Sequence, residues 1–286
     1  MFGIIGIVIT AISVIGGYAF NGGHLVVLFQ PFEWLIIVGA AVGSLLLGNP
    51  KGIILGITHN LPLVFKGPHH NQASFIELLS MLYAVFKLAK TKGDLALESH
   101  VEKPDESPLF AKFPNFNADH HTRTFLCDYL RLLTLGTSNA HELEAIIDGE
   151  IEAHHKQYHE MSHAVVLMAD AMPALGIVAA VLGVIHTMGS ITEPPEVLGH
   201  LIGAALVGTF TGVLLSYAIF APIGRNLQLC FDTDGYYFMA IKAGLLAHMQ
   251  GYAPQVSIEF ARKILPDELR PTFQELEETI NNLPPD

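Results

Sequence analysis

The most constraining feature of this sequence is an apolar run between Asp170 and Glu193, which has no Lys, Arg, Asp or Glu over 22 residues. As an α-helix, such a run covers about 33 Å, enough to cross the hydrocarbon core of a bilayer. Pro173, Ala180 and Thr187 recur every seven residues and fall near one helix face, with glycines beside them. A face of small residues favours close approach of another helix or a water-lined path. The run therefore predicts a membrane-spanning helix with one specialised face.

Three further apolar runs complete a set of four predicted transmembrane helices, at residues 1–20, 33–49, 168–191 and 197–222. Composition supports this assignment, because only 15% of the residues are charged, against roughly 25% in ordinary soluble domains. The second run has a face of small residues, namely Gly39, Ala40, Gly43 and Ser44. This face predicts tight packing on a neighbouring helix. The predicted fold class is an all-α integral membrane protein.

The segment between the second and third spans, residues 50–165, is predicted to be a large helical block. Apolar residues at helical spacing predict amphipathic helices at about 75–89 and 119–135. Ser138 or Asn139 is expected to cap the next helix. That helix is polar on most faces, and with few helix breakers it is expected to continue into the third span as a stalk.

The distribution of positive charge predicts the orientation in the membrane. All fifteen Lys and Arg residues lie in two segments, ten in residues 51–165 and five in residues 225–286. The links at 21–32 and 192–196 have none. By the positive-inside rule, the central block, the helical C-terminal tail at 223–286 and both termini are predicted to be cytoplasmic.

The predicted spans carry no acidic residue at depth. Glu33, Asp170 and Glu193 are the acidic residues nearest to the spans, and all three are expected at span ends. A proton or ion path across lipid normally needs an ionisable or polar relay group in the interior. Two interpretations follow: either the chain conducts nothing, or a partner supplies the buried acid.

Two prolines within the predicted spans bear on this choice. Because proline lacks an N–H, Pro173 deprives the carbonyl of Ala169 of its usual partner, and Pro222 does the same to Ala218. In lipid, such carbonyls are tolerated only where protein or water covers them. One interpretation is a simple kink in each helix. The other is a kink that moves, or a carbonyl that lines an ion path.

The sequence offers no candidate for catalysis. The histidines with a spacing that allows two-His chelation are His155, His159 and His163, preceded by His120 and His121. No Cys or acidic triad accompanies them, so we predict no metal site. Since there is also no glycine-rich phosphate loop and no Ser/His/Asp arrangement, we expect neither a cofactor nor enzymatic activity. The net charge of −12 argues against a nucleic-acid partner.

Several blocks of the sequence resemble the MotA-type subunit of the bacterial flagellar stator, in the MotA/TolQ/ExbB proton channel family. They are NGGHLVVLFQPFEWLIIVGAAVGSLLLGNPKG, LALESHVEKPDESPLF, ADAMPALGIVAAVLGVIHTMGSI, LGHLIGAALVGTFTGVLLSYAIFAPI and GYAPQVSIEFARKIL. The resemblance runs from Met1 to about Leu276 without large gaps. The two-plus-two arrangement of spans fits the flagellar branch, because TolQ and ExbB proteins place one span before the cytoplasmic block.

The resemblance implies a homo-pentamer in the bacterial inner membrane, surrounding two copies of a single-span MotB-type partner. That partner carries the membrane aspartate that binds the ion, and it is anchored to peptidoglycan. Ion flow is expected to turn the ring against the rotor switch protein FliG. In the family a basic residue and a glutamate contact the rotor, and they are matched here by Lys90 and Glu98. Lysine keeps the positive charge of the usual arginine but loses its planar fork.

The resemblance also assigns the ion-path residues Pro173, Ala180, Thr209 and Pro222. Sodium-driven relatives have a threonine at both positions matched by Ala180 and Thr209, whereas this chain has one, so the expected ion is the proton. The implied function is an ion-conducting stator subunit of the flagellar motor. The alternatives are a TolQ/ExbB-like energiser of outer-membrane transport, which a neighbouring TonB-like gene would favour, and a passive membrane scaffold without proton flux.

Overall fold

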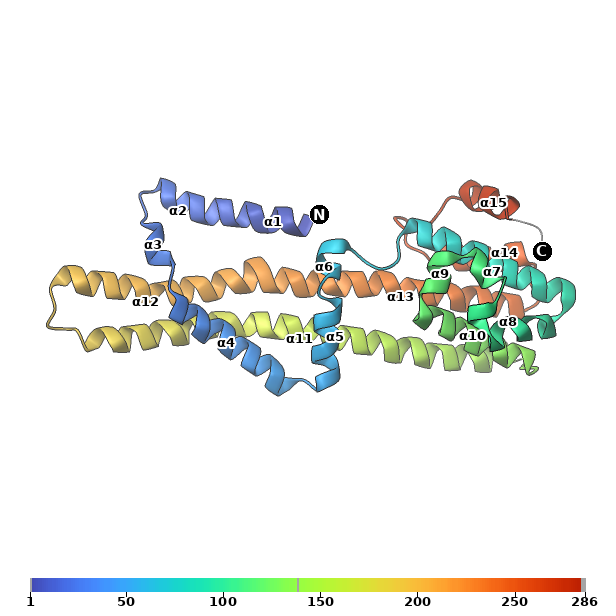
Figure 1. Cartoon of the computed structure of the whole chain (residues 1–286), viewed down its shortest axis with the longest axis horizontal. Coiled ribbons are helices and arrows are strands. Elements are labelled where there is room, and N and C mark those ends of the chain that lie inside the picture. Colours follow the sequence, from blue (N-terminus) through green and yellow to red (C-terminus); the bar gives the residue numbers. More distant parts are fainter. Residues whose placement is uncertain (1, 138, 284–286) are drawn as a thin grey trace. The chain divides into compact units, whose positions relative to one another are not determined.

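The computed structural model describes residues 2–137 and 139–283, and within these residues every regular element is helical (Figure 1). The all-α prediction is confirmed for this part of the chain. The helices form two compact units, each built from two segments of the sequence. Unit 1 comprises Met1–Gly67 and Lys156–Phe231, and unit 2 comprises Pro68–His155 and Asp232–Asp286.

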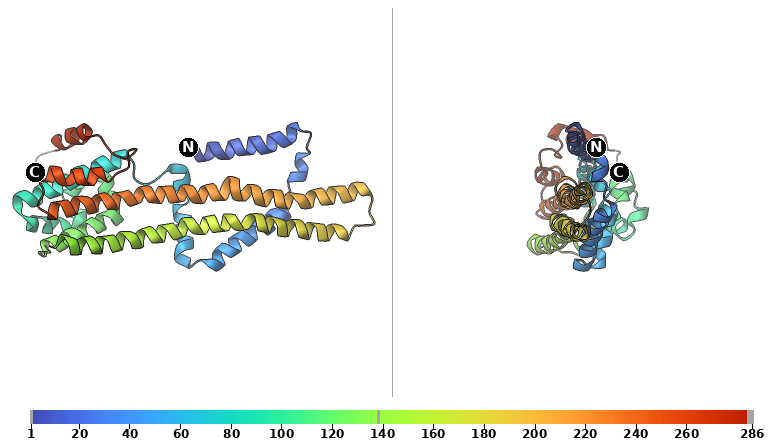
Figure 2. Two further views of the ribbon diagram at one scale, coloured as in Figure 1. Left: turned by 180° about the vertical axis from the view of Figure 1, so that it is seen from behind. Right: turned by 90° about the vertical axis from the view of Figure 1, so that its left-hand side faces the viewer.

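Unit 1 contains all four segments that were predicted to span the membrane. Its first helices are α1 (Phe2–Ala11), the π-helical turn η1 (Ile12–Gly16), α2 (Gly17–Phe20), α3 (Leu25–Leu28), α4 (Pro31–Gly48), α5 (Lys51–Asn60) and α6 (Leu63–Lys66). It continues with the second part of α11 (Ala140–Met188), then α12 (Pro195–Leu215), a second π-helical turn η5 (Ser216–Phe220) and the start of α13 (Ala221–Met249). In unit 1, α11 and α12 lie side by side and are joined by a short turn (Figures 1 and 2).

Helix α4 is longer than the second span predicted at 33–49. It begins at Pro31, because a proline in the first helical turn has no N–H partner to lose. The one-turn helix α3 precedes it, and together they form an apolar stretch of 24 residues, Leu25–Gly48.

The small-residue face predicted for α4 does not pack on a neighbour within this chain, and its packing on another chain stays a prediction. Its four residues, Gly39, Ala40, Gly43 and Ser44, are all exposed. The buried residues of α4 are Ile37 and Ala41. They join an apolar cluster with Met168, Met172, Ala179 and Leu215. Larger side chains such as Ile37 remove more apolar area from solvent, which favours their burial over that of the small residues.

Helices α5 and α6 complete unit 1 by packing against α11 and α13. Ile53, Ile57 and Leu63 share a buried cluster with residues that include Met161 and Leu227. A Cβ placed on Gly56 would lie 2.4 Å from the terminal methyl of Met161. The glycine therefore provides the space into which this methionine fits.

Unit 2 is built around α7 (Gln72–Lys92), α10 (His120–Thr134) and the first part of α11. Short helices connect α7 to α10, namely η2 (Asp94–Leu97), α8 (Glu98–Glu102), η3 (Pro104–Glu106), η4 (Phe110–Lys112) and α9 (Pro114–Ala118). The second part of α13 also belongs to unit 2, followed by α14 (Pro254–Lys263) and α15 (Phe273–Asn281). The amphipathic helices predicted at 75–89 and 119–135 are thereby confirmed as α7 and α10.

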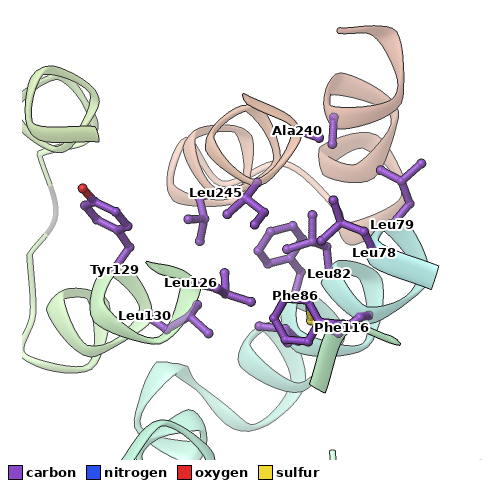
Figure 3. Close-up of a cluster of buried hydrophobic side chains, with 14 of the residues drawn as sticks. Leu78, Leu79, Leu82, Phe86, Phe116, Leu126, Tyr129, Leu130, Ala240 and Leu245 are labelled. Carbon is purple, nitrogen blue, oxygen red and sulfur yellow. The ribbon is translucent and has the colours of Figure 1, made fainter. Parts of the chain in front are cut away.

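The core of unit 2 gathers the apolar faces of these helices. Leu78, Leu82 and Phe86 of α7 meet Leu126 and Leu130 of α10 and Leu245 of α13 (Figure 3). All six side chains are completely or almost completely buried. The helical spacing of apolar residues along α7 is therefore explained by packing inside the protein.

Side-chain caps define where the helices of unit 2 begin. Asn71 and Ser74 form a reciprocal capping box at the start of α7, and Asp119 accepts hydrogen bonds at the start of α10. Asn139 Oδ1 accepts from the backbone N–H of His141 at 3.1 Å, so it caps α11 as predicted. The alternative cap, Ser138, lies outside the described residues.

Five helical stretches among the described residues are long and apolar enough to cross a membrane. Four of them overlap the predicted spans, although the third helix ends at Met188 rather than at residue 191, and the fifth is α7. The α7 stretch differs because 61% of its 18-residue apolar segment is buried inside the protein, whereas 0% of the corresponding segment in Gly3–Phe20 is buried. The apolar residues of α7 therefore already have protein partners.

Candidate functional site

The centre of unit 1 is a contact between the backbones of α11 and α12. A Cβ on Gly212 would lie 2.6 Å from the carbonyl oxygen of Met172 and 2.8 Å from the Cα of Gly176. A Cβ on Gly176 would lie 2.8 Å from the carbonyl oxygen of Gly208. Real Cβ atoms do not approach this closely, so only glycine permits this contact. The small-residue face predicted on the third span is therefore in close contact with a helix, and the structure identifies that helix as α12.

This contact brings the predicted ion-path residues Ala180 and Thr209 to neighbouring positions. A Cβ on Gly208 would lie 3.1 Å from the backbone nitrogen of Ala180, and one on Gly176 would lie 3.3 Å from the Cα of Thr209. Both Ala180 and Thr209 remain partly exposed in the single chain. Their partial exposure leaves them available at the edge of the α11–α12 contact.

Pro173 lies inside α11, and the helix is continuous through it. It is partly buried, and it follows Met172, whose carbonyl oxygen lies against Gly212. The proline therefore stands at the end of the glycine contact between the two helices. Its missing N–H weakens the helix at this point without interrupting it.

Pro222 has a different local structure. The turn before it, Ser216–Phe220, is π-helical, which is one of the recognised ways in which a helix accommodates a proline. The hydroxyl of Ser216 is buried there without a hydrogen-bond partner. Pro222 and Ala218 line a cavity of about 460 Å³ between this turn, α1 and α6. Polar side chains of Thr10 and Asn226 also line this cavity.

Glu33 is the residue that the sequence placed least accurately. It lies in the first turn of α4, as expected, but its carboxylate packs against α11 and α12. Its Oε2 lies 3.0 Å from where a Cβ on Gly208 would be, and its Oε1 lies 3.8 Å from the same position on Gly183. The expectation that Glu33 lies at a span end is met, but its contact with α11 and α12 was not predicted.

The predicted rotor-contact residues Lys90 and Glu98 both lie in unit 2 and are exposed. Lys90 is in the last turn of α7, where its Nζ donates a hydrogen bond to the carbonyl oxygen of Gly251 at 3.1 Å. Glu98 begins α8. The hydrogen bond ties Lys90 to the segment just before α14, which contains part of the GYAPQVSIEFARKIL block.

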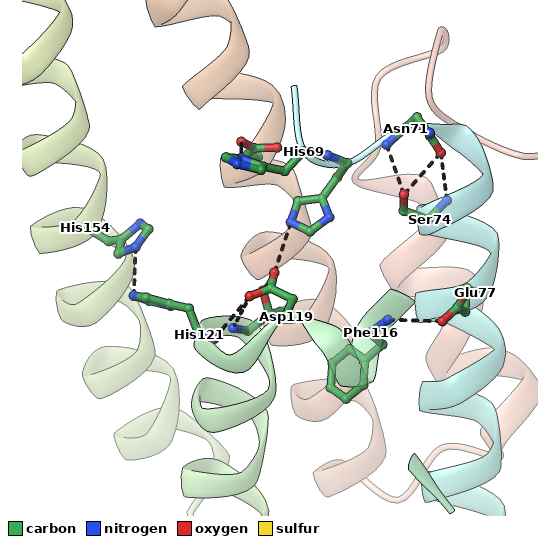
Figure 4. Close-up of polar contacts among 11 residues, drawn as sticks. His69, Asn71, Ser74, Glu77, Phe116, Asp119, His121 and His154 are labelled. Carbon is green, nitrogen blue, oxygen red and sulfur yellow. Dashed lines mark hydrogen bonds and ion pairs between the residues drawn. The ribbon is translucent and has the colours of Figure 1, made fainter. Parts of the chain in front are cut away.

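Histidines form a polar network in unit 2 rather than a single cluster. His69 Nδ1 lies 2.9 Å from Asp234 Oδ2, and this hydrogen bond raises the pKa of His69. His121 and His154 point toward each other from α10 and α11, with their Nε2 atoms 3.1 Å apart (Figure 4). Burial, followed by repulsion from His121, lowers the pKa of His154 to about 4.

The helical trio considered for chelation does not form one group. His155 Nε2 lies 3.4 Å from Asp232 Oδ1. The rings of His159 and His163 stack on each other instead, with their centroids 5.8 Å apart. In the described part of the chain, no group of three or more His, Cys, Asp or Glu residues is arranged to hold a metal ion.

Comparison with known proteins identifies the family. The motility protein A N-terminal region matches residues 4–93, and the MotA/TolQ/ExbB proton channel family matches residues 117–233. Motility protein A of Escherichia coli (strain K12) is 39% identical over 277 residues, which cover 97% of this chain and 94% of that protein. The chain belongs to the motility protein A family. Chemotaxis protein LafT of Vibrio parahaemolyticus is 34% identical over 96% of both chains.

The fold agrees with solved structures of family members in complexes. C. jejuni MotAB matches with a TM-score of 0.78 at 23% identity, covering 95% of this chain and 98% of that chain. The flagellar MotAB stator complex from Bacillus subtilis matches with a TM-score of 0.71 at 25% identity, covering 92% and 95%. The second family region, residues 117–233, contains Pro173, Ala180, Thr209 and Pro222.

The sequence alone could not have placed Glu33 beside Gly208. Glu33 and Gly208 belong to helices far apart in the sequence, and hydropathy locates Glu33 only at the edge of an apolar run. The one available signal was the pair of glycines, Gly183 and Gly208, which marks where backbone or a long side chain can approach closely. That signal indicates a contact, but not its partner.

Proposed function

We propose that this chain is the ion-conducting stator subunit of a bacterial flagellar motor, in which proton flow drives rotation. The observation that carries the proposal is that relatives named motility protein A match the chain over almost their whole length. The contact of α11 with α12 supports it, since it places Pro173, Ala180 and Thr209 along one pair of helices. The proposed role is ion conduction and mechanical coupling, with no enzymatic activity, metal or cofactor.

We further propose that residues 1–20, 33–49, 168–191 and 197–222 cross the inner membrane. The central block, the tail and both termini then lie in the cytoplasm. The positive charges support this orientation, because the links between paired spans have none. The exposure of many large apolar side chains on α1, α4, α11 and α12 also supports it.

The proposed partner is a MotB-type single-span protein, and the support for it is that complexes named MotAB share this fold. We propose five copies of this chain around two copies of that partner, which supplies the acid that binds the ion. Lys90 and Glu98 are proposed to contact the rotor switch protein FliG. Both are exposed and charged, which suits a changing electrostatic contact between moving surfaces.

The proton is the proposed ion because only one of the two positions, Thr209, has a hydroxyl group. Ala180 has only a methyl group beside the contact between α11 and α12. Sodium needs several oxygen ligands to replace its hydration shell. A proton needs only one acceptor group at a time. One charge crossing about 100 mV releases about 2.3 kcal/mol, which sets the work available for each step.

The function is tested by co-expressing the chain with a MotB-type partner in flagellated cells that lack their own stator. We expect motility to be restored for the natural sequence and lost for Pro173→Leu. Pro195→Leu, in the first turn of α12, is the matched control and is expected to swim. Paralysed cells despite a membrane-inserted complex, or full torque with Pro173→Leu, would contradict the proposal.

The rotor contact is tested separately with Lys90→Glu, which is expected to reduce torque and to be partly rescued by charge reversals on FliG. Lys92→Glu is the control, because Lys92 is an exposed lysine at the same end of α7. If no charge reversal on FliG restores torque to Lys90→Glu, Lys90 is not a rotor contact.

A further inference from the structure

The carboxylate of Glu33 occupies a position that needs an explanation. Its Oε2 is buried and has no hydrogen-bond partner, although the whole side chain is only partly buried. Buried polar atoms are usually paired, because an unpaired one loses its interaction with water without compensation. An unpaired carboxylate oxygen within a membrane-spanning bundle is therefore a candidate for function.

Backbone and methyl groups of α11 and α12 lie beside this carboxylate. Gly183, Gly208, Ala179 and Ala205 meet at this level of the α11–α12 contact, and the backbone nitrogen of Ala180 is adjacent. None of these side chains can bind or release a proton. Among the residues in this contact, Glu33 can do so, and it lies beside Ala180, the position on which the proposed choice between proton and sodium depends.

The glycines give the carboxylate its place. A side chain at Gly208 would begin 3.0 Å from Oε2, and one at Gly183 would begin 3.8 Å from Oε1 and 2.7 Å from the Cβ of Ala205. Glycine at both positions thus leaves room for the carboxyl group between the helices. The carboxyl group also lies near the start of α4, which follows the link at 21–32 that we assign to the outer side of the membrane.

We propose that Glu33 is a proton-relay residue of the ion path. A hydronium ion from the outer side gives its proton to a Glu33 carboxylate oxygen, forming the O–H bond and leaving water. That O–H bond then breaks as the proton passes to the carboxylate of the partner helix, which restores the Glu33 carboxylate. This inference rests on the proposed function, and it adds a residue of this chain to a path otherwise completed by the partner.

The test uses the full chain in complex with its MotB-type partner, reconstituted in vesicles. Proton flux is measured per assembled complex under an imposed gradient, together with the thermal stability of the complex. The variants are Glu33→Gln, which keeps the size but removes the acid, and Glu33→Asp, which keeps the acid but shortens it. Glu196→Gln is the control, because Glu196 is an exposed acid in the first turn of α12.

A relay role and a packing role of Glu33 predict opposite orders of proton flux for Glu33→Gln and Glu33→Asp. If Glu33 relays protons, Glu33→Gln lowers flux by about tenfold, in keeping with what positioned proton-transfer groups contribute, while Glu33→Asp retains more flux than Glu33→Gln. If Glu33 only fills space, Glu33→Gln resembles the natural chain and Glu33→Asp is the damaged variant. Equal flux in all variants, or failure of both Glu33 variants to assemble, also overturns the relay role.

The outcome for the natural sequence separates this inference from the function itself. If the natural complex carries no proton flux, the proposed function fails whatever Glu33 does. If the natural complex and Glu196→Gln conduct while Glu33→Gln conducts equally well, the proposed function stands and the relay is wrong.

Discussion

Gly212 is the residue on which the contact between α11 and α12 depends most closely. Replacing it with valine would place a Cβ 2.6 Å from the carbonyl oxygen of Met172 and 2.8 Å from the Cα of Gly176. Because both atoms belong to backbone, neither can move aside without moving a helix. We expect Gly212→Val to cost about 1–3 kcal/mol or more of stability and to lower the unfolding temperature of the purified chain in detergent.

Gly203→Val is the matched control on the same helix. No atom lies within 4 Å of a Cβ placed on Gly203, so the added side chain has open space. The two variants make the same chemical change in the same helix, and only their neighbours differ. An equal fall in unfolding temperature for both would contradict the role assigned to the glycine contact.

His154 provides a second prediction at this scale. Its folded-state pKa of about 4 lies below the usual 6.5, so the unfolded chain binds a proton between these values that the folded chain does not. The contribution of His154 to stability is therefore full above pH 6.5 and is lost as the pH falls through 4. After allowance for solvent screening, we expect an effect of about 1 kcal/mol.

The measurement is the unfolding temperature of the full chain in detergent between pH 7 and pH 4. It should fall less for His154→Gln than for the natural chain, while His141→Gln, at an exposed position in α11, should follow the natural chain. His69 acts in the opposite direction. Since its pKa is raised by Asp234, its contribution is full below its usual pKa and is lost as the pH rises through its folded value. Identical pH profiles for His154→Gln and the natural chain would contradict the assignment.

At the scale of the element, the π-helical turn η5 is the clearest local consequence of a single residue. Pro222 cannot donate to the carbonyl of Ala218, and the preceding turn widens to Ser216–Phe220. Proline inside a helix costs about 3 kcal/mol. We expect Pro222→Ala to convert this turn to α-helix, to slow hydrogen exchange of its amides, and to raise the unfolding temperature while lowering torque.

Pro195→Ala is the control for this prediction, because Pro195 occupies the first turn of α12, where a proline costs little. It should change neither hydrogen exchange in η5 nor torque. Should Pro222→Ala leave exchange in η5 unchanged, the π-helical turn does not depend on the proline.

The helices themselves follow from the sequence, because apolar runs and 3.6-residue spacing are local properties. The positions of α7, α10, α11 and α12 were predicted on this basis. A small-residue face on the third span was predicted as well, but not that α12 is the helix that it contacts. The turn η5 was not predicted. A proline shows which carbonyl loses its partner, but not whether the helix bends or widens in response.

Contacts between distant segments were harder to predict. The face containing Gly39 and Gly43 has the same pattern as the faces that do pack, yet it is exposed in this chain. Sequence patterns show that a face can accept a close neighbour but not whether one is present. The position of Glu33 was missed for the same reason. Hydropathy shows where along a helix a residue lies, but it does not show where that helix crosses another one.

At the scale of the whole molecule, the division into two units was only partly predictable. The predicted central block ran from 50 to 165, whereas unit 2 comprises Pro68–His155 and Asp232–Asp286. Residues 51–67 and 156–165 belong to unit 1 instead, where Ile53 and Met161 are part of one buried cluster. The boundary at Gly67 and Pro68 lies in the loop between α6 and α7, but the other two boundaries lie inside α11 and α13, where no loop marks them.

The choice of ion is a prediction about the assembled molecule. With Ala180 in place of a second threonine, we expect swimming to continue in sodium-free medium and to stop when a protonophore dissipates the proton gradient. Speed should be measured in cells that have this chain and its partner as their only stator. A requirement for sodium would contradict the assignment of the proton. Adding the hydroxyl with Ala180→Thr tests whether this position controls the ion.

The glycine contact also has a mechanical consequence. Side chains between helices act as compliant spacers, because rotamer changes can absorb small displacements, whereas backbone atoms in direct contact cannot. At Gly176, Gly208 and Gly212, α11 and α12 touch through backbone atoms. We therefore expect this part of the α11–α12 pair to move as one rigid body. The cavity beside Pro222 is then where elastic deformation of unit 1 can be accommodated at low cost.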